Sequence, residues 1–373
     1  MYIENIRIGE NIFGNPVFTS RTAGNHHISV TGMSGSGKTV WLTFLETWLA
    51  SKGATVIVLD YANTHNLERI SSPWQSDFER LSKTFDIKQD GIPFPLWPRH
   101  LSGEEDRRGD ILTVLDIVSK TAKLSTIQRA CLLNILERTV YQHRFNQSDE
   151  LDSLLASIEE YAKSCLSDEK REIRRIYTKL ALAAKSTKIA PEQAMIPGKI
   201  NILKVDYGDY TGLAVCNLIL DLLWQDMRRR EADHAQETFL VLDEYQHLDL
   251  IHDDAPLSNM LREGRRYGLS VILSTQNLSG FTVKEKELVN QAATKIYFRQ
   301  TKRDAFEITK GFPEKERRTM ANTLTSLKVG QCCAEGVFSI DNMLKDSMVT
   351  LNIRKQKQIA ITVPSVRRAK VSR

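Results

Sequence analysis

The sequence predicts an α/β fold with a mostly parallel β-sheet, flanking helices and an inserted α-helical subdomain. Two observations support this prediction. Short apolar runs of strand length alternate along the chain with stretches of helix length, which is the pattern of βαβ units. Between Arg107 and Lys185 the alternation stops, because this block has long stretches of helical spacing and no comparable apolar run. The chain has 373 residues, which suits one enlarged α/β domain or about two folding units.

Each core element has its own signal in the sequence. The expected strands are continuous apolar runs, as in parallel strands buried on both faces, and the expected helices show apolar residues at helical spacing. The first strand begins at Ile28 and leads into a helix that runs from Val40 to Ala50. The later strands are expected at Ala54–Asp60, Gly198–Asp206, the FLVL run ending at Leu242, Leu269–Asn277 and Ala293–Gln300. Further helices are expected at Gly212–Arg230 and Leu257–Tyr267.

The segment ISVTGMSGSGKTVWL, from Ile28 to Leu42, contains the phosphate-binding pattern G-x-x-x-x-G-K-[ST]. Its glycines permit backbone angles that turn successive N–H groups inward around a phosphate, at the positive end of the following helix. The Lys38 ammonium supplies a charge for the β- and γ-phosphates, and the Thr39 hydroxyl is a ligand for Mg²⁺. We therefore predict a nucleotide site made by Gly32, Ser34, Gly35, Ser36, Gly37, Lys38, Thr39 and Val40.

The segment FLVLDEYQHL places two acids, Asp243 and Glu244, at the carboxyl end of an apolar strand. In a sheet with a phosphate-binding loop, the first acid reaches Mg²⁺, and the second aligns or deprotonates the attacking water. The second acid favours repeated ATP hydrolysis over a nucleotide kinase or a switch GTPase. Two alternatives remain: Glu244 only caps the strand end, or it pairs with His247 as an E-x-x-H metal site. The latter is disfavoured because the segment leaves a strand.

The segment GRRYGLSVILSTQ supplies the other candidate site residues. Gln276 ends a buried strand, so its amide can lie near the γ-phosphate and sense hydrolysis. Arg265 and Arg266 lie just before that strand, and a guanidinium that reaches a neighbour's γ-phosphate is an arginine finger. The alternatives are a polar strand end for Gln276 and a solvated helix end for the two arginines.

Composition restricts the class of protein. The sequence has no apolar run of about 18 residues and no signal-peptide pattern at its start, so we expect a cytoplasmic protein without an integral membrane segment. Its five cysteines show no C-x-x-C spacing, which argues against a zinc site or a disulfide framework. The net charge is +5, and residues 354–373 hold seven lysines and arginines with no acid. This basic tail either contacts DNA phosphates or only improves solubility.

The order of these motifs resembles the HerA/FtsK superfamily of P-loop ATPases, whose relatives include conjugation coupling proteins and viral genome-packaging motors. The resemblance rests on NHHISVTGMSGSGKT, the strand ending in Asp60, FLVLDEYQHL, LREGRRYGLSVILSTQ, NQAATKIYFRQ and LKVGQCCAEGVF. It covers residues 25–62 and about 198–340. It implies a RecA-like core that uses ATP and Mg²⁺, in a hexameric ring that draws double-stranded DNA through a central channel.

The resemblance also implies roles for individual residues. Lys38 and Thr39 contact phosphate and Mg²⁺, Asp243 is the Walker B acid, Glu244 the catalytic base and Gln276 the sensor. Arg265 is the expected finger for the adjacent subunit, with Arg266 as its substitute. The chain departs from the family in two respects: about 25 residues before His26 leave no room for an N-terminal barrel or membrane helices, and YANTH after Asp60 lacks a second acid.

The chain is expected to divide into four parts. Residues 1–62 form the first part of the core with a short N-terminal β segment, and 63–194 a mostly helical insertion. Residues 195–353 complete the core, and 354–373 are the basic tail. The insertion can grip DNA, dock a nuclease or other effector, or brace the ring.

Two functions of other classes use the same P-loop. One is an ATP-dependent protein remodeller or secretion ATPase, and the other is a non-translocating ATPase scaffold for an effector protein. An ABC-type clamp is disfavoured, because LSGEE at 101–105 lies far upstream of the Walker B strand.

Overall fold

The computed structural model describes most of the chain. The described residues are 3–20, 24–65, 73–97, 104–142, 150–165, 167–185, 187–193, 195–206, 210–230, 237–247, 255–340, 343–346 and 349–352. The predicted basic tail, 354–373, lies outside them.

The predicted α/β fold is confirmed by the main sheet. Its nine strands have the order β13-β10-β9-β3-β8-β7-β4-β6-β5. All neighbouring pairs from β9 to β5 are parallel, and β10 is antiparallel to β9 and β13. The strands are β3 (Ile28–Thr31), β4 (Thr55–Asp60), β5 (Ser82–Asp86), β6 (Ile200–Lys204), β7 (Thr238–Leu242), β8 (Leu269–Thr275), β9 (Thr294–Tyr297), β10 (Gln331–Glu335) and β13 (Val349–Asn352).

The central strands are buried along almost their whole length because both faces of the sheet are covered. In β4, Val56 and Val58 belong to one buried cluster, whereas Ile57 and Leu59 belong to the other. Successive side chains of a strand point to opposite faces, so each strand contributes to both cores. Each such side chain stabilises the fold by about 1.5–3 kcal/mol when it is fully buried.

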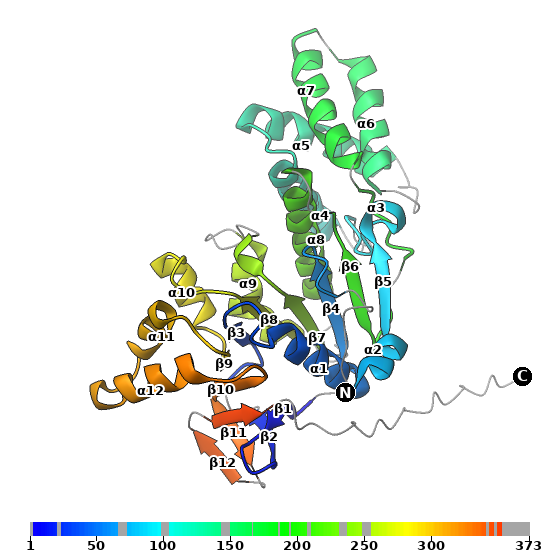
Figure 1. The fold of residues 1–373 in the computed structure, drawn as a ribbon. Coiled ribbons are helices and arrows are strands. Elements are labelled where there is room, and N and C mark those ends of the chain that lie inside the picture. The colour runs from blue at the N-terminus through cyan, green and yellow to red at the C-terminus, as the bar shows by residue number, and fades with distance from the viewer. Residues whose placement is uncertain are drawn as a thin grey trace, which may run out of the picture.

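Helices lie on both faces of the sheet (Figure 1). The first core is shared with α1 (Lys38–Ser51) and α2 (Gln75–Leu81), and the second with α8 (Tyr210–Arg229) and α9 (Pro256–Glu263). Two short helices complete this part, namely α3 (Ile87–Asp90) and the 3-10 helix η5 (Gly264–Tyr267). The phosphate-binding loop therefore leads into a helix that is buried against the sheet.

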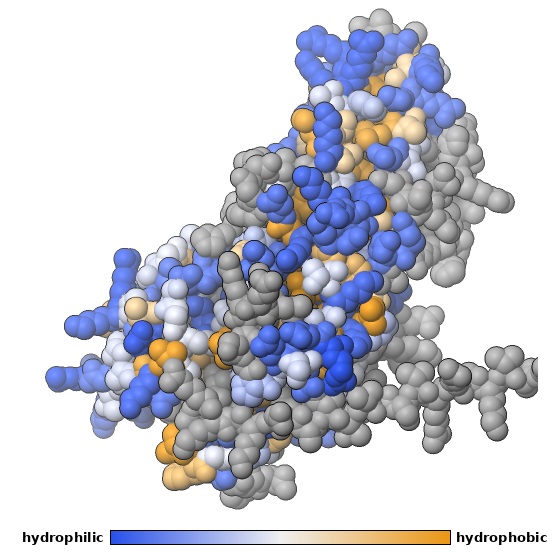
Figure 2. All heavy atoms as spheres, turned by 45° about the vertical axis from the view of Figure 1, so that its right-hand side comes forward, coloured by the Kyte–Doolittle hydropathy of each residue, from blue (hydrophilic) through white to orange (hydrophobic). Residues whose placement is uncertain are grey.

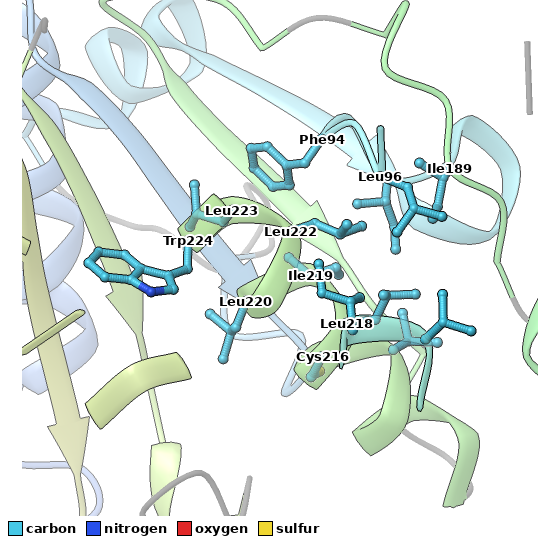
Figure 3. Packing of buried hydrophobic residues seen from close by; sticks show 14 of the residues in the cluster. Phe94, Leu96, Ile189, Cys216, Leu218, Ile219, Leu220, Leu222, Leu223 and Trp224 are labelled. Atoms are coloured by element: carbon cyan, nitrogen blue, oxygen red, sulfur yellow. The ribbon is translucent and has the colours of Figure 1, made fainter. Parts of the chain in front are cut away.

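Four consecutive helices form most of the segment between β5 and β6. They are α4 (Glu104–Thr121), α5 (Thr126–Gln142), α6 (Glu150–Ser164) and α7 (Ser167–Ala184). They extend away from the sheet at the end opposite the N-terminus (Figure 1). At their base, Phe94 and Leu96 before the helices and Ile189 after them pack beside α8 (Figure 3). The outer ends of these helices carry mostly hydrophilic side chains (Figure 2).

A second, four-stranded sheet joins the two ends of the described chain. Its order is β1-β2-β11-β12, formed by β1 (Asn5–Glu10), β2 (Pro16–Ser20), β11 (Val337–Ile340) and β12 (Met343–Asp346). Beside the main sheet lie α10 (Val283–Val289), α11 (Lys302–Thr309) and α12 (Glu314–Ser326) (Figure 1). Ile6, Ile8 and Phe338 connect the small sheet to the core that covers α1.

The structure adds elements that the apolar pattern does not indicate. β5 lies within the range expected to be mostly helical, yet it pairs in parallel with β6 at the edge of the main sheet. All five cysteines are free. Within the described ranges, no helix is long and apolar enough to cross a membrane.

Candidate functional site

The predicted nucleotide and hydrolysis residues meet at the carboxyl edge of the main sheet. β3 pairs with β8 so that Thr31 lies opposite Thr275, and β8 pairs with β7 so that Leu273 lies opposite Leu242. The loop after each strand therefore emerges at the same edge. These loops carry the P-loop after β3, Asp243 and Glu244 after β7, and Gln276 after β8.

The P-loop backbone is fixed by its neighbours. Met33 N donates to Arg299 O at 2.8 Å, and Gly330 N donates to Ser36 O at 2.9 Å. Gly37 has a φ of 110°, in the left-handed region that favours glycine. Gly32 is required by space, because a Cβ there would lie 2.5 Å from the Phe298 Cβ. The loop is therefore held in one shape from both sides.

The start of α1 offers free backbone donors next to this loop. Its N-cap residue, Gly37, makes no side-chain capping hydrogen bond, and the first turn contains no acid. The first N–H groups of a helix have no partner within the helix, and the helix dipole attracts anions to this end. Thr39 and Val40 lie in this first turn, half-buried and exposed respectively. Ser34 and Gly35 are exposed on the same loop.

Lys38 is buried and bends back over its own loop. Its Nζ donates to Gly32 O at 2.6 Å and to Met33 O at 3.4 Å. Burial lowers the pKa of the Lys38 ammonium, and the negative charges of Glu244 and Asp243 partly oppose this effect. The positive charge is therefore placed between the phosphate-binding loop and the two acids after β7.

The two oxygens of the buried Asp243 carboxylate have different surroundings. Oδ1 accepts a hydrogen bond from Glu244 N at 3.0 Å. Oδ2 is buried without a hydrogen-bond partner among the described residues. A buried carboxylate oxygen of this kind and the Thr39 hydroxyl are hard oxygen ligands, which suit Mg²⁺. These residues therefore fit the predicted magnesium site.

Glu244 is held by two glutamine side chains. Its Oε1 accepts from Gln276 Nε2 at 2.8 Å, and its Oε2 accepts from Gln246 Nε2 at 2.6 Å. Glu244 also has a φ of 56°, which is uncommon for a residue other than glycine. The structure thus brings Glu244 and the predicted sensor Gln276 into direct contact.

Arg265 and Arg266 lie at the opposite edge of the sheet from the P-loop. Both are exposed on η5, just before β8 begins. β8 contains seven residues, which at about 3.3 Å per residue separates its two ends by roughly 20 Å. The Arg266 guanidinium lies over the Tyr267 ring at 5.8 Å. Neither arginine therefore belongs to the P-loop site of its own chain.

A buried network after β4 contacts both α1 and the Walker B segment. Tyr61 Oη donates to Asp243 O at 2.5 Å. The His65 ring lies 2.9 Å from Glu46 Oε1, and both side chains are fully buried. Thr64 N and His65 N donate to Asp60 at 2.9 and 3.3 Å. The Asp60 carboxylate therefore holds the turn that follows its own strand.

His65 and Asp60 each shift the pKa of the other. Burial by itself lowers the pKa of His65, but the charges and hydrogen bonds of Glu46 and Asp60 outweigh it and raise the pKa well above 6.5. Burial by itself raises the pKa of Asp60, but the His65 contacts and the Thr64 and His65 N–H groups outweigh it and lower the pKa.

The His65 network predicts a pH-dependent contribution to stability. A group with a raised folded-state pKa stabilises the fold fully below its unfolded pKa and loses this effect as pH rises through the folded value. We expect His65→Asn to lower the free energy of unfolding by about 3 kcal/mol at pH 6 and by less at pH 9. Denaturant titrations of both proteins at several pH values measure this difference. Glu46→Gln should show the same pH trend, and a cost that grows with pH would contradict the account.

The sequence also raises a metal site at Glu244 and His247, by their E-x-x-H spacing. The described residues contain no group of three or more histidines, cysteines or acids arranged to hold a metal ion. Three more metal-ligating residue types come soon after His247 in the sequence. They are His252, Asp253 and Asp254, and they lie outside the described residues. Glu244 instead uses its carboxylate to accept the two amide hydrogen bonds.

The sequence interpretation missed Gln246 and the His65 network. The only sequence signal for Gln246 is its position two residues after Glu244. Its contact depends on the 3-10 helix η4 (Tyr245–His247), which has no strong pattern. For His65, adjacent polar residues after a strand are also typical of an ordinary solvated loop.

Comparison with known proteins identifies similar sequences and folds. The family model described as helicase HerA, central domain, matches residues 20–221. Among solved structures, VirB4 of Thermoanaerobacter pseudethanolicus has a TM-score of 0.63 and 16% identity, covering 95% of this chain and 97% of that one. A search of curated proteins finds no match.

The plasmid coupling protein TrwB gives a second set of matches. Its complex with the ATP analogue ADPNP has a TM-score of 0.60 and 13% identity, covering 98% of this chain and 96% of that one. Its complex with ADP and Mg²⁺ has a TM-score of 0.60 and 14% identity, covering 96% of this chain and 91% of that one. These likenesses confirm the RecA-like P-loop fold that the sequence predicts.

Proposed function

Because the chain belongs to the family of the helicase HerA central domain, we propose that it is an ATPase that forms a ring and moves along or pumps double-stranded DNA. The observation that supports this most directly is the shared edge of the main sheet. There the P-loop, two acids and a glutamine follow three separate strands. Together they offer groups for binding phosphate and Mg²⁺ and for activating the attacking water.

ATP and Mg²⁺ are the proposed ligands of this site. TrwB, which shares the fold, has been solved with an ATP analogue and with ADP and Mg²⁺. Backbone N–H groups of residues 34–35 and 37–40 bind the phosphates, and the Lys38 ammonium turns from the Gly32 and Met33 carbonyls to them. Thr39 and Asp243 Oδ2 hold the metal. When bound, Mg²⁺ neutralises charge on the β- and γ-phosphate oxygens.

The hydrolysis step uses the residues after β7 and β8. Glu244 accepts a proton from the attacking water while the water oxygen approaches the γ-phosphorus. The bond between the γ-phosphorus and the leaving ADP oxygen then breaks. Gln276 contacts Glu244 and directly follows β8, the strand next to the P-loop strand β3, so its amide is suited to exchange between Glu244 and the γ-phosphate. In this way the glutamine senses the presence of ATP.

The position of the arginines supports the proposed ring. An arginine finger neutralises transition-state charge on the γ-phosphate. Arg265 lies at the far edge of its own sheet and is exposed, so as an arginine finger it would serve the P-loop of an adjacent subunit. Arg265 is favoured over Arg266, whose guanidinium stacks on Tyr267. We propose a homo-hexamer, the assembly implied by the resemblance to HerA and FtsK proteins.

Mixing variants tests the action of Arg265 between subunits. Arg265→Ala and Glu244→Gln should each lower ATP hydrolysis strongly when present alone. In mixed rings, some interfaces combine an intact Arg265 with an intact Glu244, so we expect part of the activity to return. Steady-state hydrolysis at varied mixing ratios measures the recovery. Intact assembly without recovery at any ratio would contradict a role across the interface.

Other parts of the chain have proposed roles in the same motor. The helices α4–α7 extend from the core, and we propose that they contact DNA or a separate effector such as a nuclease. The basic residues 354–373 are a further candidate for DNA phosphate contact. Since the motor consumes ATP and acts on DNA, we propose that it works in the cytoplasm.

A triplex-displacement assay tests the proposed movement. A third strand bound near one end of a linear duplex is released when a motor passes along that duplex. We expect ATP-dependent release by the wild-type protein and none by Glu244→Gln. ATP hydrolysis without release, at a rate that responds only to a protein partner, would instead favour a scaffold or a protein-remodelling ATPase.

A further inference from the structure

We propose that Gln246 is a positioning residue for ATP hydrolysis, which anchors Oε2 of Glu244 so that Oε1 accepts the proton of the attacking water. This inference rests on the proposed function, because it concerns the residue that orients the proposed base. It adds a residue of this chain to the P-loop, the two acids and the sensor.

The contact itself is short and polar. The Gln246 Nε2 lies 2.6 Å from Glu244 Oε2, and both side chains are half-buried. A carboxylate only accepts hydrogen bonds, so the amide nitrogen and not the amide oxygen must face it. Hydrogen bonds to an ionised group are about twice as strong as neutral ones. The pair therefore fixes one oxygen of the carboxylate.

The support for Gln246 is local and rigid. Gln246 lies on η4 directly after Tyr245, whose ring is buried and stacks on Phe281 with centroids 5.4 Å apart. Glu244 itself has the left-handed φ of 56°. Because acid and amide lie two residues apart on this packed turn, they keep their relative position when neighbouring strands shift.

The second glutamine has a different relation to the acid. Gln276 contacts Oε1 from the end of β8, a separate strand. If Gln276 turns to the γ-phosphate, as a sensor does, Oε1 loses its partner while Oε2 keeps Gln246. The freed oxygen is then the one available to water. Without Gln246, the same exchange would leave the whole carboxylate free to rotate.

Replacing Gln246 by a side chain of similar length without a donor tests this role. We expect Gln246→Met to lower kcat for ATP about 10- to 100-fold, since small losses of alignment at a reacting group have effects of this size. The Kd for a non-hydrolysable ATP analogue should stay unchanged, because Gln246 contacts Glu244 and is not part of the P-loop. Gln246→His, whose ring N–H can donate, should restore part of kcat.

The control is Gln291→Met, which changes an exposed glutamine before β9, at the opposite edge of the sheet. It should leave kcat and the analogue Kd unchanged. Two results would overturn the inference. One is a purely structural effect of Gln246→Met, which would weaken analogue binding and would not be reversed by histidine. The other is a kcat of Gln246→Met at or above the wild-type value. Absence of hydrolysis by the wild-type protein would instead refute the proposed ATPase function.

Discussion

Glu244→Gln is expected to lower the rate of ATP hydrolysis by 10²- to 10⁴-fold, the usual contribution of a positioned general base. The substitution removes the proton acceptor and keeps the size of the side chain. It leaves the P-loop and Lys38 intact, so ATP should still bind. Single-turnover hydrolysis should therefore be slow while the nucleotide remains bound, and size-exclusion chromatography should show an assembled ring that retains unhydrolysed ATP.

A matched control separates this effect from a general loss of charge. Glu316 is an exposed acid on α12, so Glu316→Gln makes the same chemical change outside the site and should keep wild-type turnover. Normal turnover by Glu244→Gln would refute the assignment of the base. Loss of nucleotide binding by this variant would show that Glu244 supports the P-loop instead of the hydrolysis step.

Lys38→Ala is expected to weaken ATP binding strongly and to abolish detectable hydrolysis. The Lys38 ammonium is buried between the P-loop carbonyls and the two acids after β7. A charged hydrogen bond of this kind contributes about 1.5–3 kcal/mol, or roughly 10- to 150-fold in Kd. Hydrolysis should fall further, because the same charge stabilises the transition state. Fluorescent-nucleotide titration and steady-state hydrolysis measure the two effects.

The control for this substitution is Lys315→Ala, which removes an exposed lysine on α12. It should bind and hydrolyse ATP normally. Retention of wild-type affinity by Lys38→Ala would contradict the placement of the phosphates at the P-loop. A wild-type rate of hydrolysis would contradict the role of the ammonium in the transition state.

The core strands could be predicted from sequence because they are buried on both faces. TVIVLD in β4 and LSVILST in β8 each have an uninterrupted apolar centre, and the chain alternates such strands with helices. The edge strand β5, SKTFD, has mixed polarity because much of it is half-buried or exposed. The small sheet was harder still to predict from sequence, since it pairs β2 with β11 from distant parts of the chain.

The candidate site was predictable where residue spacing is set by a motif or a strand end. Glycines, Lys38 and Thr39 follow a fixed loop pattern, and Asp243 and Gln276 end apolar strands. Contacts that depend on local backbone geometry were not predictable. Gln246 reaches Glu244 only through the packed turn of η4, and His65 reaches Glu46 only because the turn after β4 folds against α1.

The most direct test of the central claim is steady-state ATP hydrolysis by the purified protein under three conditions. The rate is measured without nucleic acid, with linear duplex DNA and with single-stranded DNA, using Lys38→Ala as the blank. The account predicts strong stimulation by duplex DNA above the other two conditions. An ATPase rate that no nucleic acid changes would contradict the DNA motor and would favour an ATPase that acts on a protein partner.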